Sequence, residues 1–257
     1  MGRTVIVGDV HGCRRELVLL LEAVGFTAGD RLVFVGDLVA RGPDSLGVLD
    51  VARRTGAVVV RGNHEDKLLA WRDTNATGAS ADGRAAPPRL AARVTLGHMH
   101  LALARSLRPV DWSLLETSPY FYDLPEHGLR VVHAGVQPGL AIEATPPSTL
   151  TRVRTLRDDG SASAGAGATL WGARYVGPPH VVFGHNAAPG LQLHRWATGL
   201  DTGCVYGKRL TAMVLEAGAR VPASPSGRRA LLVSQAAARV YYQPAGAEKS
   251  RGRAGAA

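Results

Sequence analysis

The chain has 257 residues, 46% of them hydrophobic, and a net charge of +9 at pH 7. Its length and apolar content predict one globular domain with a sizeable core. No apolar run approaches the roughly 20 residues of a membrane span, a strand pattern from residue 4 leaves no room for a signal peptide, and two cysteines do not make a disulfide framework. We therefore expect a cytoplasmic protein with no membrane partner.

The first third of the chain alternates strand patterns with helical patterns. Residues 4–7, 32–35 and 58–60 are short apolar runs rich in β-branched side chains, which are typical of buried strands. Residues 14–24 and 45–54 carry apolar residues at helical spacing. This order predicts parallel strands with helices packed outside them.

The middle of the chain predicts a helical insertion over about residues 72–128. A third helix is expected at 63–71, and residues 73–88 are rich in Gly, Ala, Pro and Asp, so we expect a mobile loop there. Residues 90–107 and 111–117 are helical in pattern. We expect these helices to cap the functional site before the chain returns to a strand.

The last third predicts more strands and a tail. The apolar run at 129–132 is followed by strand patterns that we expect to complete a second sheet, at residues 181–183, 191–195, 198–200 and 210–215. Residues 1–243 are therefore expected to form a single domain. The tail at 244–257 consists mainly of Ala, Gly and charged residues, a composition typical of disorder.

Five of the strand patterns end in short motifs that contain glycine and polar side chains. The motifs are GDVHG at residues 8–12, GDLVARG at 36–42, GNHE at 62–65, VHAG at 132–135 and FGHN at 183–186. Open α/β sheets place their chemistry where strands give way to turns. Five such motifs, each following a strand, therefore predict one functional site.

The residue types in these motifs indicate a metal centre. Asp, His and Asn without thiolates suit Zn²⁺, Mn²⁺, Fe or Ni, and they argue against an iron–sulfur cluster or a structural zinc site. Only an oxygen ligand such as Asp37 readily bridges two cations. The other candidates divide around it, with Asp9 and His11 on one side and Asn63, His133 and His185 on the other. Two metals about 3.5–4 Å apart are the usual arrangement for in-line attack on phosphorus.

The ordered set of GDVHG, GDLVARGPDS, GNHE, HAGV and GH resembles the calcineurin-like metallophosphoesterases. It is most similar to their phosphoprotein phosphatase branch, which includes the bacterial diadenosine tetraphosphatases. The resemblance runs from about residue 4 to residue 215 and includes LDTGCVYG at 200–207. It implies an α/β fold of four layers (α/β/β/α), in which a two-sheet β-sandwich is flanked by helices.

The resemblance also implies a role for each motif residue. One metal would be held by Asp9, His11 and Asp37, and the other by Asp37, Asn63, His133 and His185. Arg41 would bind the phosphoryl group, and His64 would protonate the leaving group. Arg174, in the looser match LWGARY at 170–175, would be a second catalytic and substrate-binding arginine. The cofactors would be two divalent ions, with Mn²⁺ favoured over Fe, Zn, Ni or Co.

One residue departs from the pattern of the protein phosphatases. Many of them carry Asp where this chain has Ala40, and that carboxylate would orient the general-acid histidine. Its absence leaves His64 less firmly held unless Glu65 or Asp66 takes over. A weak general acid matters little when a nucleoside phosphate leaves, because this group departs as a stable anion with a second pKa of about 6.

These observations predict a phosphohydrolase that uses a metal-bridging hydroxide and forms no covalent intermediate. The substrate favoured by Ala40 is a phosphoric anhydride of a nucleoside polyphosphate, such as diadenosine tetraphosphate. A bacterial phosphoprotein phosphatase is the alternative, since its motifs are shared. A nucleic-acid phosphodiesterase is less favoured. The oligomeric state is left open.

The remaining histidines and the basic C-terminus have simpler interpretations. His98 and His100 cannot share a helix face at a spacing of two, so no joint metal site is expected there. His127, His180 and His194 are interpreted as surface or core residues. Residues 219–257 contain seven Lys or Arg and one Glu, which accounts for +6 of the net charge of +9. We interpret this excess mainly as solubility charge, and nucleic-acid attraction as the alternative.

Overall fold

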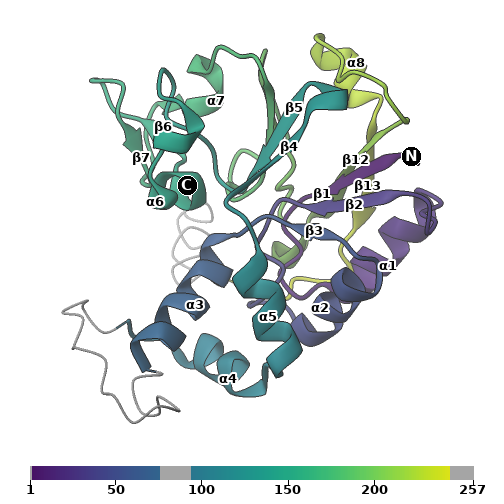
Figure 1. Ribbon diagram of the computed structural model, residues 1–257, viewed down its shortest axis with the longest axis vertical. Coiled ribbons are helices and arrows are strands. Elements are labelled where there is room, and N and C mark those ends of the chain that lie inside the picture. The colour runs from purple at the N-terminus through teal and green to yellow at the C-terminus, as the bar shows by residue number, and fades with distance from the viewer. Residues whose placement is uncertain (1, 76–93, 244–257) are drawn as a thin grey trace, which may run out of the picture.

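Two five-stranded sheets form the centre of the computed structural model, which describes residues 2–75 and 94–243 (Figure 1). The first sheet has the order β13-β12-β1-β2-β3. Its strands are β1 (Thr4–Val7), β2 (Arg31–Phe34), β3 (Val58–Val59), β12 (Arg209–Leu215) and β13 (Leu232–Ala236). β1, β2 and β3 run parallel, which confirms the prediction from their alternation with helices.

The second sheet has the order β10-β11-β9-β5-β4. Its strands are β4 (Phe121–Leu124), β5 (Leu129–Val132), β9 (His180–Phe183), β10 (Gln192–Leu193) and β11 (Ala197–Gly199). β5, β9 and β11 are parallel, and the two edge strands are antiparallel to them. A small third sheet contains β6 (Thr155–Leu156), β7 (Ala162–Ser163) and β8 (Thr169–Leu170).

Strand alternation divides the apolar side chains between three cores. Val5 and Val7 of β1 pack against the helices on one face, whereas Ile6 points to the other sheet. In the second sheet, Val131 faces that same central core and Val132 faces outward. Because successive side chains in a strand point to opposite faces, each sheet is buried on both sides.

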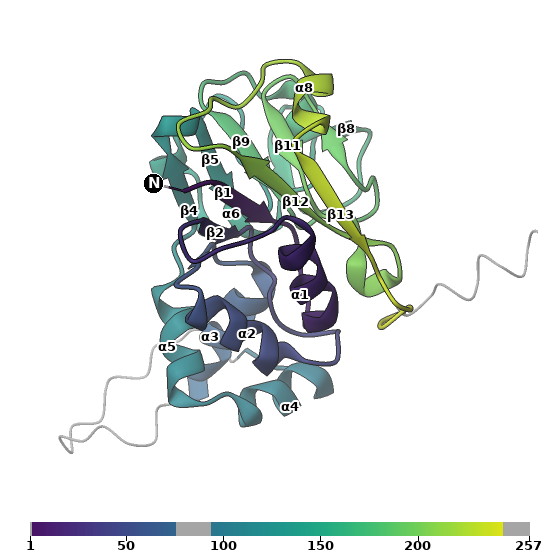
Figure 2. The same cartoon turned by 90° about the vertical axis from the view of Figure 1, so that its right-hand side faces the viewer.

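Helices cover the outer face of each sheet, so the expected four layers are present (Figures 1 and 2). The first sheet is covered by α1 (Arg14–Ala23), α2 (Ser45–Arg54) and α3 (Asn63–Asn75). Beyond them, α5 (Pro109–Thr117) packs on α2 and α3, and α4 (His98–Ser106) contacts α3 through His100 and His64. The second sheet is covered by α6 (Pro147–Arg152) and α7 (Trp171–Arg174). The remaining short elements are α8 (Pro225–Arg229) and the 3₁₀ helices η1 (Pro125–His127), η2 (Ile142–Ala144) and η3 (Cys204–Tyr206).

Two strands lie elsewhere than the sequence predicts. Residues 210–215 were expected in the second sheet, which is wrong, because β12 pairs antiparallel with β1 in the first. Residues 121–124, placed within the insertion, form β4 at the edge of the second sheet. The predicted loop at 73–88 overlaps the end of α3, and its remainder, like the tail at 244–257, lies outside the described residues. Among the described residues, no helix combines the length and apolar character needed to cross a membrane.

Candidate active site

The motif loops of both sheets converge at one edge of the sandwich. Asp9, Asp37 and Asn63 follow β1, β2 and β3, while His133 and His185 follow β5 and β9. Backbone hydrogen bonds join the loops within each sheet, from His11 N to Asp37 O at 2.8 Å and from Gly184 N to His133 O at 2.7 Å. The carboxyl ends of parallel strands therefore bring these residues together, as the sequence predicted.

The backbone of these loops is strained. In the described residues, the non-glycine positions with positive φ are all in the motifs: His11, Asp37, Ala40, Arg41 and His185, with φ between 47° and 68°. The left-handed region is uncommon for residues that carry a Cβ. Such strain persists only where the surrounding structure holds it, and it concentrates at functional sites.

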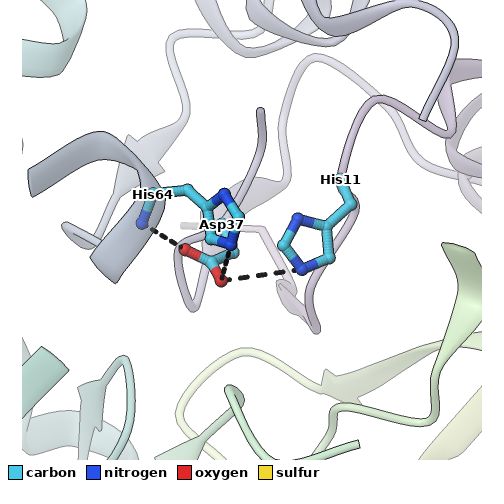
Figure 3. A group of neighbouring side chains, drawn as sticks. All are labelled: His11, Asp37 and His64. Carbon is cyan, nitrogen blue, oxygen red and sulfur yellow. Dashed lines mark hydrogen bonds and ion pairs between the residues drawn. The ribbon is translucent and has the colours of Figure 1, made fainter. Parts of the chain in front are cut away.

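Asp37 is the common member of two groups of potential metal ligands. One group joins it to His11 and His64 (Figure 3), and the other joins it to His133 and His185. Its Oδ2 atom lies 3.6 Å from His11 Nε2 and 3.5 Å from His133 Nε2. Asp37 is 2% exposed. A single buried carboxylate between two sets of imidazoles is the geometry expected of a ligand shared by two cations.

The histidines around Asp37 are oriented by backbone carbonyls. His11 Nδ1 donates to Val39 O at 3.1 Å, and His133 Nδ1 donates to Val35 O at 3.0 Å. Because a carbonyl only accepts, these bonds place the hydrogen on Nδ1 and direct Nε2 toward Asp37. Metal-binding histidines are commonly oriented in this way, so the donor set fits divalent cations.

Asn63 and His185 complete the second group. The Asn63 Oδ1 atom lies 3.2 Å from His133 Nε2. His185 Nε2 donates to Arg152 O at 3.2 Å, which leaves Nδ1 as its unprotonated nitrogen. Both residues line the same cavity as Asp37.

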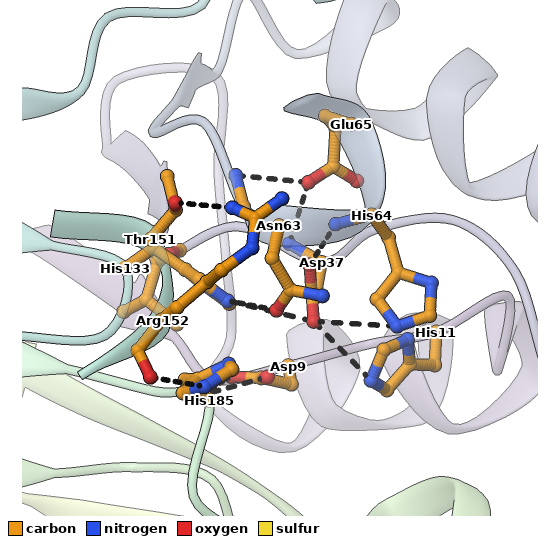
Figure 4. A network of polar contacts seen from close by, with 12 residues as sticks. Asp9, His11, Asp37, Asn63, His64, Glu65, His133, Thr151, Arg152 and His185 are labelled. Carbon is orange, nitrogen blue, oxygen red and sulfur yellow. Dashed lines mark hydrogen bonds and ion pairs between the residues drawn. The ribbon is translucent and has the colours of Figure 1, made fainter. Parts of the chain in front are cut away.

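Asp9 lies beside the second group and accepts from the backbone of the last motif. Both of its carboxylate oxygens lie 3.0 Å from His185 N (Figure 4). The approach requires glycine at position 184, because a Cβ there would lie 1.9 Å from Asp9 Oδ1. Asp9 is therefore held by the strand that also carries His185.

The charges of the site depend on one another. Burial would raise the pKa of Asp37, but the surrounding histidines, His133 first, hold it well below its usual range. Burial opposes the protonation of His133, yet Asp37 raises the pKa of His133 to about 9. Burial, followed by repulsion from Asp201, raises the pKa of Asp9. The negative charge that retains a proton on His133 is the charge that a divalent cation would neutralise.

Glu65 supports the loop beneath Asp37. Its Oε2 accepts from Asp37 N and Gly62 N, both at 2.9 Å, and its Oε1 accepts from Leu38 N at 2.9 Å and Val39 N at 3.3 Å. The side chain is fully buried. Glu65 thus has a structural role, because all its hydrogen bonds go to the backbone that shapes the site.

His64 is held by a residue that the sequence analysis did not assign to the site. Its Nδ1 lies 2.9 Å from His100 Nε2 on α4, and the two rings stack with centroids 4.8 Å apart. The other ring nitrogen, Nε2, lies 4.0 Å from Asp37 Oδ2. Burial lowers the pKa of both His64 and His100. The sequence pointed to a different partner for His64 only through Ala40, which stands where many protein phosphatases carry an aspartate.

Cationic side chains line a cavity of about 330 Å³ above Asp37. Arg41 Nη1 lies 2.7 Å from His11 Nε2, and the guanidinium packs over the rings of Tyr206 and Tyr242 at 5.7 and 5.6 Å. Arg154 and the exposed Lys208 also line the cavity. The site therefore combines a ligand cluster at its base with three positive charges on its walls.

Arg174 is not among the residues that line this cavity. It is exposed on the short helix α7. Arg154, on the segment between α6 and β6, is the arginine that lines the cavity together with Arg41. Sequence reasoning missed it because no motif marks that segment.

Comparisons with known proteins agree with this geometry. The family model for calcineurin-like phosphoesterases matches residues 2–189. The chain is 30% identical to the asymmetrical bis(5'-nucleosyl)-tetraphosphatase PrpE of Halalkalibacterium halodurans, over 81% of this chain and 88% of the relative. It is also 30% identical to the symmetrical bis(5'-nucleosyl)-tetraphosphatase of Shewanella sediminis, over 84% and 95%.

Solved structures show the same fold. A crystal structure provisionally described as a diadenosine tetraphosphatase shares 35% identity, covers 92% of this chain and 94% of its own, and superposes with a TM-score of 0.74. A serine/threonine phosphatase of Saccharomyces cerevisiae superposes with a TM-score of 0.52 at 15% identity, over 95% of this chain and 82% of its own, and shows the fold alone. The chain belongs to the calcineurin-like phosphoesterase family. It is a hydrolase, and its family implies divalent metal ions.

Proposed function

We propose that this enzyme hydrolyses phosphoric anhydrides of nucleoside polyphosphates, dinucleoside tetraphosphates such as diadenosine tetraphosphate above all. The observation that carries this proposal is the cavity in which Arg41, Arg154 and Lys208 surround the Asp37 cluster. A polyphosphate chain bears several negative charges in a row, whereas a phosphomonoester bears at most two. Three cationic side chains beside a divalent-metal cluster suit the longer anion.

Each side chain has a distinct task in this proposal. Asp9, His11 and Asp37 would hold one metal ion, and Asp37, Asn63, His133 and His185 would hold the other. Bound divalent ions neutralise phosphoryl charge and lower the pKa of water toward about 7. Arg41 binds the phosphoryl oxygens with its paired N–H groups.

We propose Mn²⁺ as the working metal, since imidazole, carboxylate and amide donors suit it and no thiolate competes. Both cysteines are free thiols, which supports a reducing, cytoplasmic compartment.

His64 protonates the leaving oxygen, and the demand on it depends on the substrate. A nucleoside phosphate departs as a stable anion, whereas a serine alkoxide must be protonated. A neutral partner at His64 in place of a carboxylate therefore supports anhydrides over phosphoprotein esters. The names of the relatives support the same substrate class.

The test is a panel of substrates with Mn²⁺ added. Diadenosine tetraphosphate, ATP, a phosphoserine peptide and 4-nitrophenyl phosphate are compared by kcat/KM, and the nucleotide products are separated. We expect the highest value for diadenosine tetraphosphate. The relatives include symmetrical and asymmetrical enzymes, so the products identify the position of cleavage. Symmetrical cleavage gives two molecules of ADP, and asymmetrical cleavage gives ATP and AMP. A phosphopeptide preferred over every nucleotide would replace this proposal with a phosphoprotein phosphatase.

A further inference from the structure

The helix α4 places a second histidine directly against the proposed general acid. His100 is buried, at 8% exposed, and its Nε2 lies 2.9 Å from His64 Nδ1. The two rings are nearly parallel, with 22° between their planes. The contact combines a hydrogen bond with ring stacking, so it restricts both the tilt and the rotation of the His64 ring.

The neighbouring carboxylates are occupied elsewhere. Glu65 accepts hydrogen bonds from four backbone N–H groups. Three belong to the Asp37 loop, and the fourth belongs to Gly62, just before α3. Asp66 accepts from the Tyr120 hydroxyl at 3.2 Å and pairs with Arg152 at 3.3 Å. Neither carboxylate forms a hydrogen bond or ion pair with the His64 ring, so neither takes the partner role that the sequence left open to them. Among the described residues, the hydrogen bond to Nδ1 of His64 comes from His100.

This contact determines which ring nitrogen of His64 faces the proposed leaving group. With Nδ1 directed at His100, Nε2 is turned toward Asp37 and the cluster at the base of the cavity. A side chain that donates a proton to a leaving group must present that nitrogen within hydrogen-bond reach of it. Rotation of the ring about its last side-chain bond would take Nε2 out of position.

We propose that His100 is a positioning residue, which holds the His64 ring so that Nε2 faces the leaving oxygen. The proposal rests on the general-acid role proposed for His64. His100 supplies orientation without a fixed negative charge, in contrast to a carboxylate partner. Its effect on the rate therefore grows with the basicity of the leaving group, because only poor leaving groups depend on the proton.

The experiment uses three variants of the full chain. His100→Phe keeps a ring for stacking and removes the hydrogen bond, His100→Gln keeps an N–H group near the position of Nε2, and His98→Phe changes an exposed residue of the same helix. With Mn²⁺ present, kcat and KM are measured for aryl phosphates from 4-nitrophenyl to phenyl phosphate. Melting temperature and bound metal are measured on each variant.

For His100→Phe we expect kcat to fall about 10-fold on phenyl phosphate, within the 10²–10⁴-fold total of general-acid catalysis, and to change less than about 3-fold on 4-nitrophenyl phosphate. KM and metal content stay unchanged, His100→Gln recovers most of the loss, and His98→Phe matches the wild type. Equal losses across the series, or no loss, would overturn the positioning role.

If His100→Phe does not fold, His100→Leu, which also removes the hydrogen bond to His64 Nδ1, takes its place in the same series. A loss that grows from 4-nitrophenyl to phenyl phosphate supports the role, and an equal loss on all substrates, or no loss, contradicts it. The proposed nucleotide substrate is judged separately, by the wild-type enzyme on diadenosine tetraphosphate. Its failure leaves the aryl phosphate series interpretable.

Discussion

Asp37 is the residue on which the two ligand groups depend, since its carboxylate lies within 3.6 Å of imidazoles from both. Replacing one of its oxygens with an amide nitrogen presents a donor where a cation should bind. We expect Asp37→Asn to lose both metals and to lower turnover to background. Phosphate release, bound metal and the melting temperature with and without Mn²⁺ measure the effect. Because a bound ligand stabilises the native state, Mn²⁺ should raise the melting temperature of wild type but not that of Asp37→Asn.

Asp66→Asn is the matched control for this prediction. Asp66 also lies near the site but contacts Tyr120 and Arg152 rather than the cluster. It should keep its metals and its Mn²⁺-dependent stabilisation. Near-normal turnover with a full metal complement in Asp37→Asn would refute the shared carboxylate.

Glu65 is expected to contribute to stability rather than to chemistry. In Glu65→Gln, one oxygen that accepts two N–H groups becomes an N–H₂ group that faces them, so buried donors lose their partners. We expect a loss of about 1–3 kcal/mol in the free energy of unfolding for each group left unsatisfied. Urea denaturation measures it, with the exposed Glu22→Gln as control. An unchanged unfolding midpoint would show that the backbone bonds to Glu65 carry little stability.

The sequence predicted well which motif residues gather at the sheet edge, and it predicted their neighbours poorly. Asp9, Asp37 and His133 each follow a strand within a glycine-containing motif, so local sequence fixes their place at the sheet edge. Arg154 and His100 lie in segments between these motifs, and their positions depend on how distant elements pack. The same limit applies to Arg174, which the sequence indicated and which does not line the cavity.

At the scale of elements, the segment after β13 returns to the active site. Tyr241 N and Tyr242 N both donate to Val205 O at 3.0 Å, and the Tyr241 hydroxyl donates to Glu16 Oε1 at 2.7 Å. These bonds place the Tyr242 ring beneath the Arg41 guanidinium. The C-terminal segment thereby helps to hold the arginine proposed to bind phosphate.

This arrangement predicts an effect of the ring on activity. We expect Tyr242→Ala to lower kcat/KM about 2- to 30-fold, which corresponds to a cation–π contribution of about 0.5–2 kcal/mol. Tyr242→Phe retains the ring and should remain close to wild type. Steady-state kinetics with diadenosine tetraphosphate measures both variants. Equal activity in Ala and Phe variants would show that Arg41 does not need this ring.

Element types were easier to predict than sheet membership. The apolar run that forms β12 predicts a strand. A strand in either sheet, however, could direct its alternate side chains into the central core. Its pairing with β1 joins residues that are far apart in sequence, such as Ile6 and Met213. A pattern of period two specifies a strand and does not specify its neighbour.

At the scale of the whole molecule, part of the excess positive charge is used inside the fold. Arg228 is fully buried and donates to Pro222 O at 2.9 Å, to Ala223 O and to His194 O. Arg220 donates to Pro125 O at 3.1 Å. These contacts give a structural reason for basic residues in the C-terminal stretch, and they weaken the nucleic-acid interpretation.

Deletion of residues 244–257 tests what remains of that interpretation. The deletion removes two Arg, one Lys and one Glu. We expect hydrolysis of diadenosine tetraphosphate to stay within about 2-fold of wild type, because the deletion removes none of the proposed metal ligands and none of the residues that line the cavity. DNA and RNA binding are followed against salt concentration. A protein that uses this tail to bind nucleic acid would lose affinity on deletion, and its salt dependence would become less steep.

The position of α4 has an evolutionary consequence. The helix that carries His100 belongs to a segment between α3 and β4, outside both central sheets and without any of the proposed metal ligands. On the role proposed for His100, substitutions there would change how strongly the leaving group is protonated, while the residues that would hold the metal ions stay as they are. Substitutions in this one surface helix could therefore change the preference for anhydride or ester substrates during evolution, without any change in the proposed metal ligands.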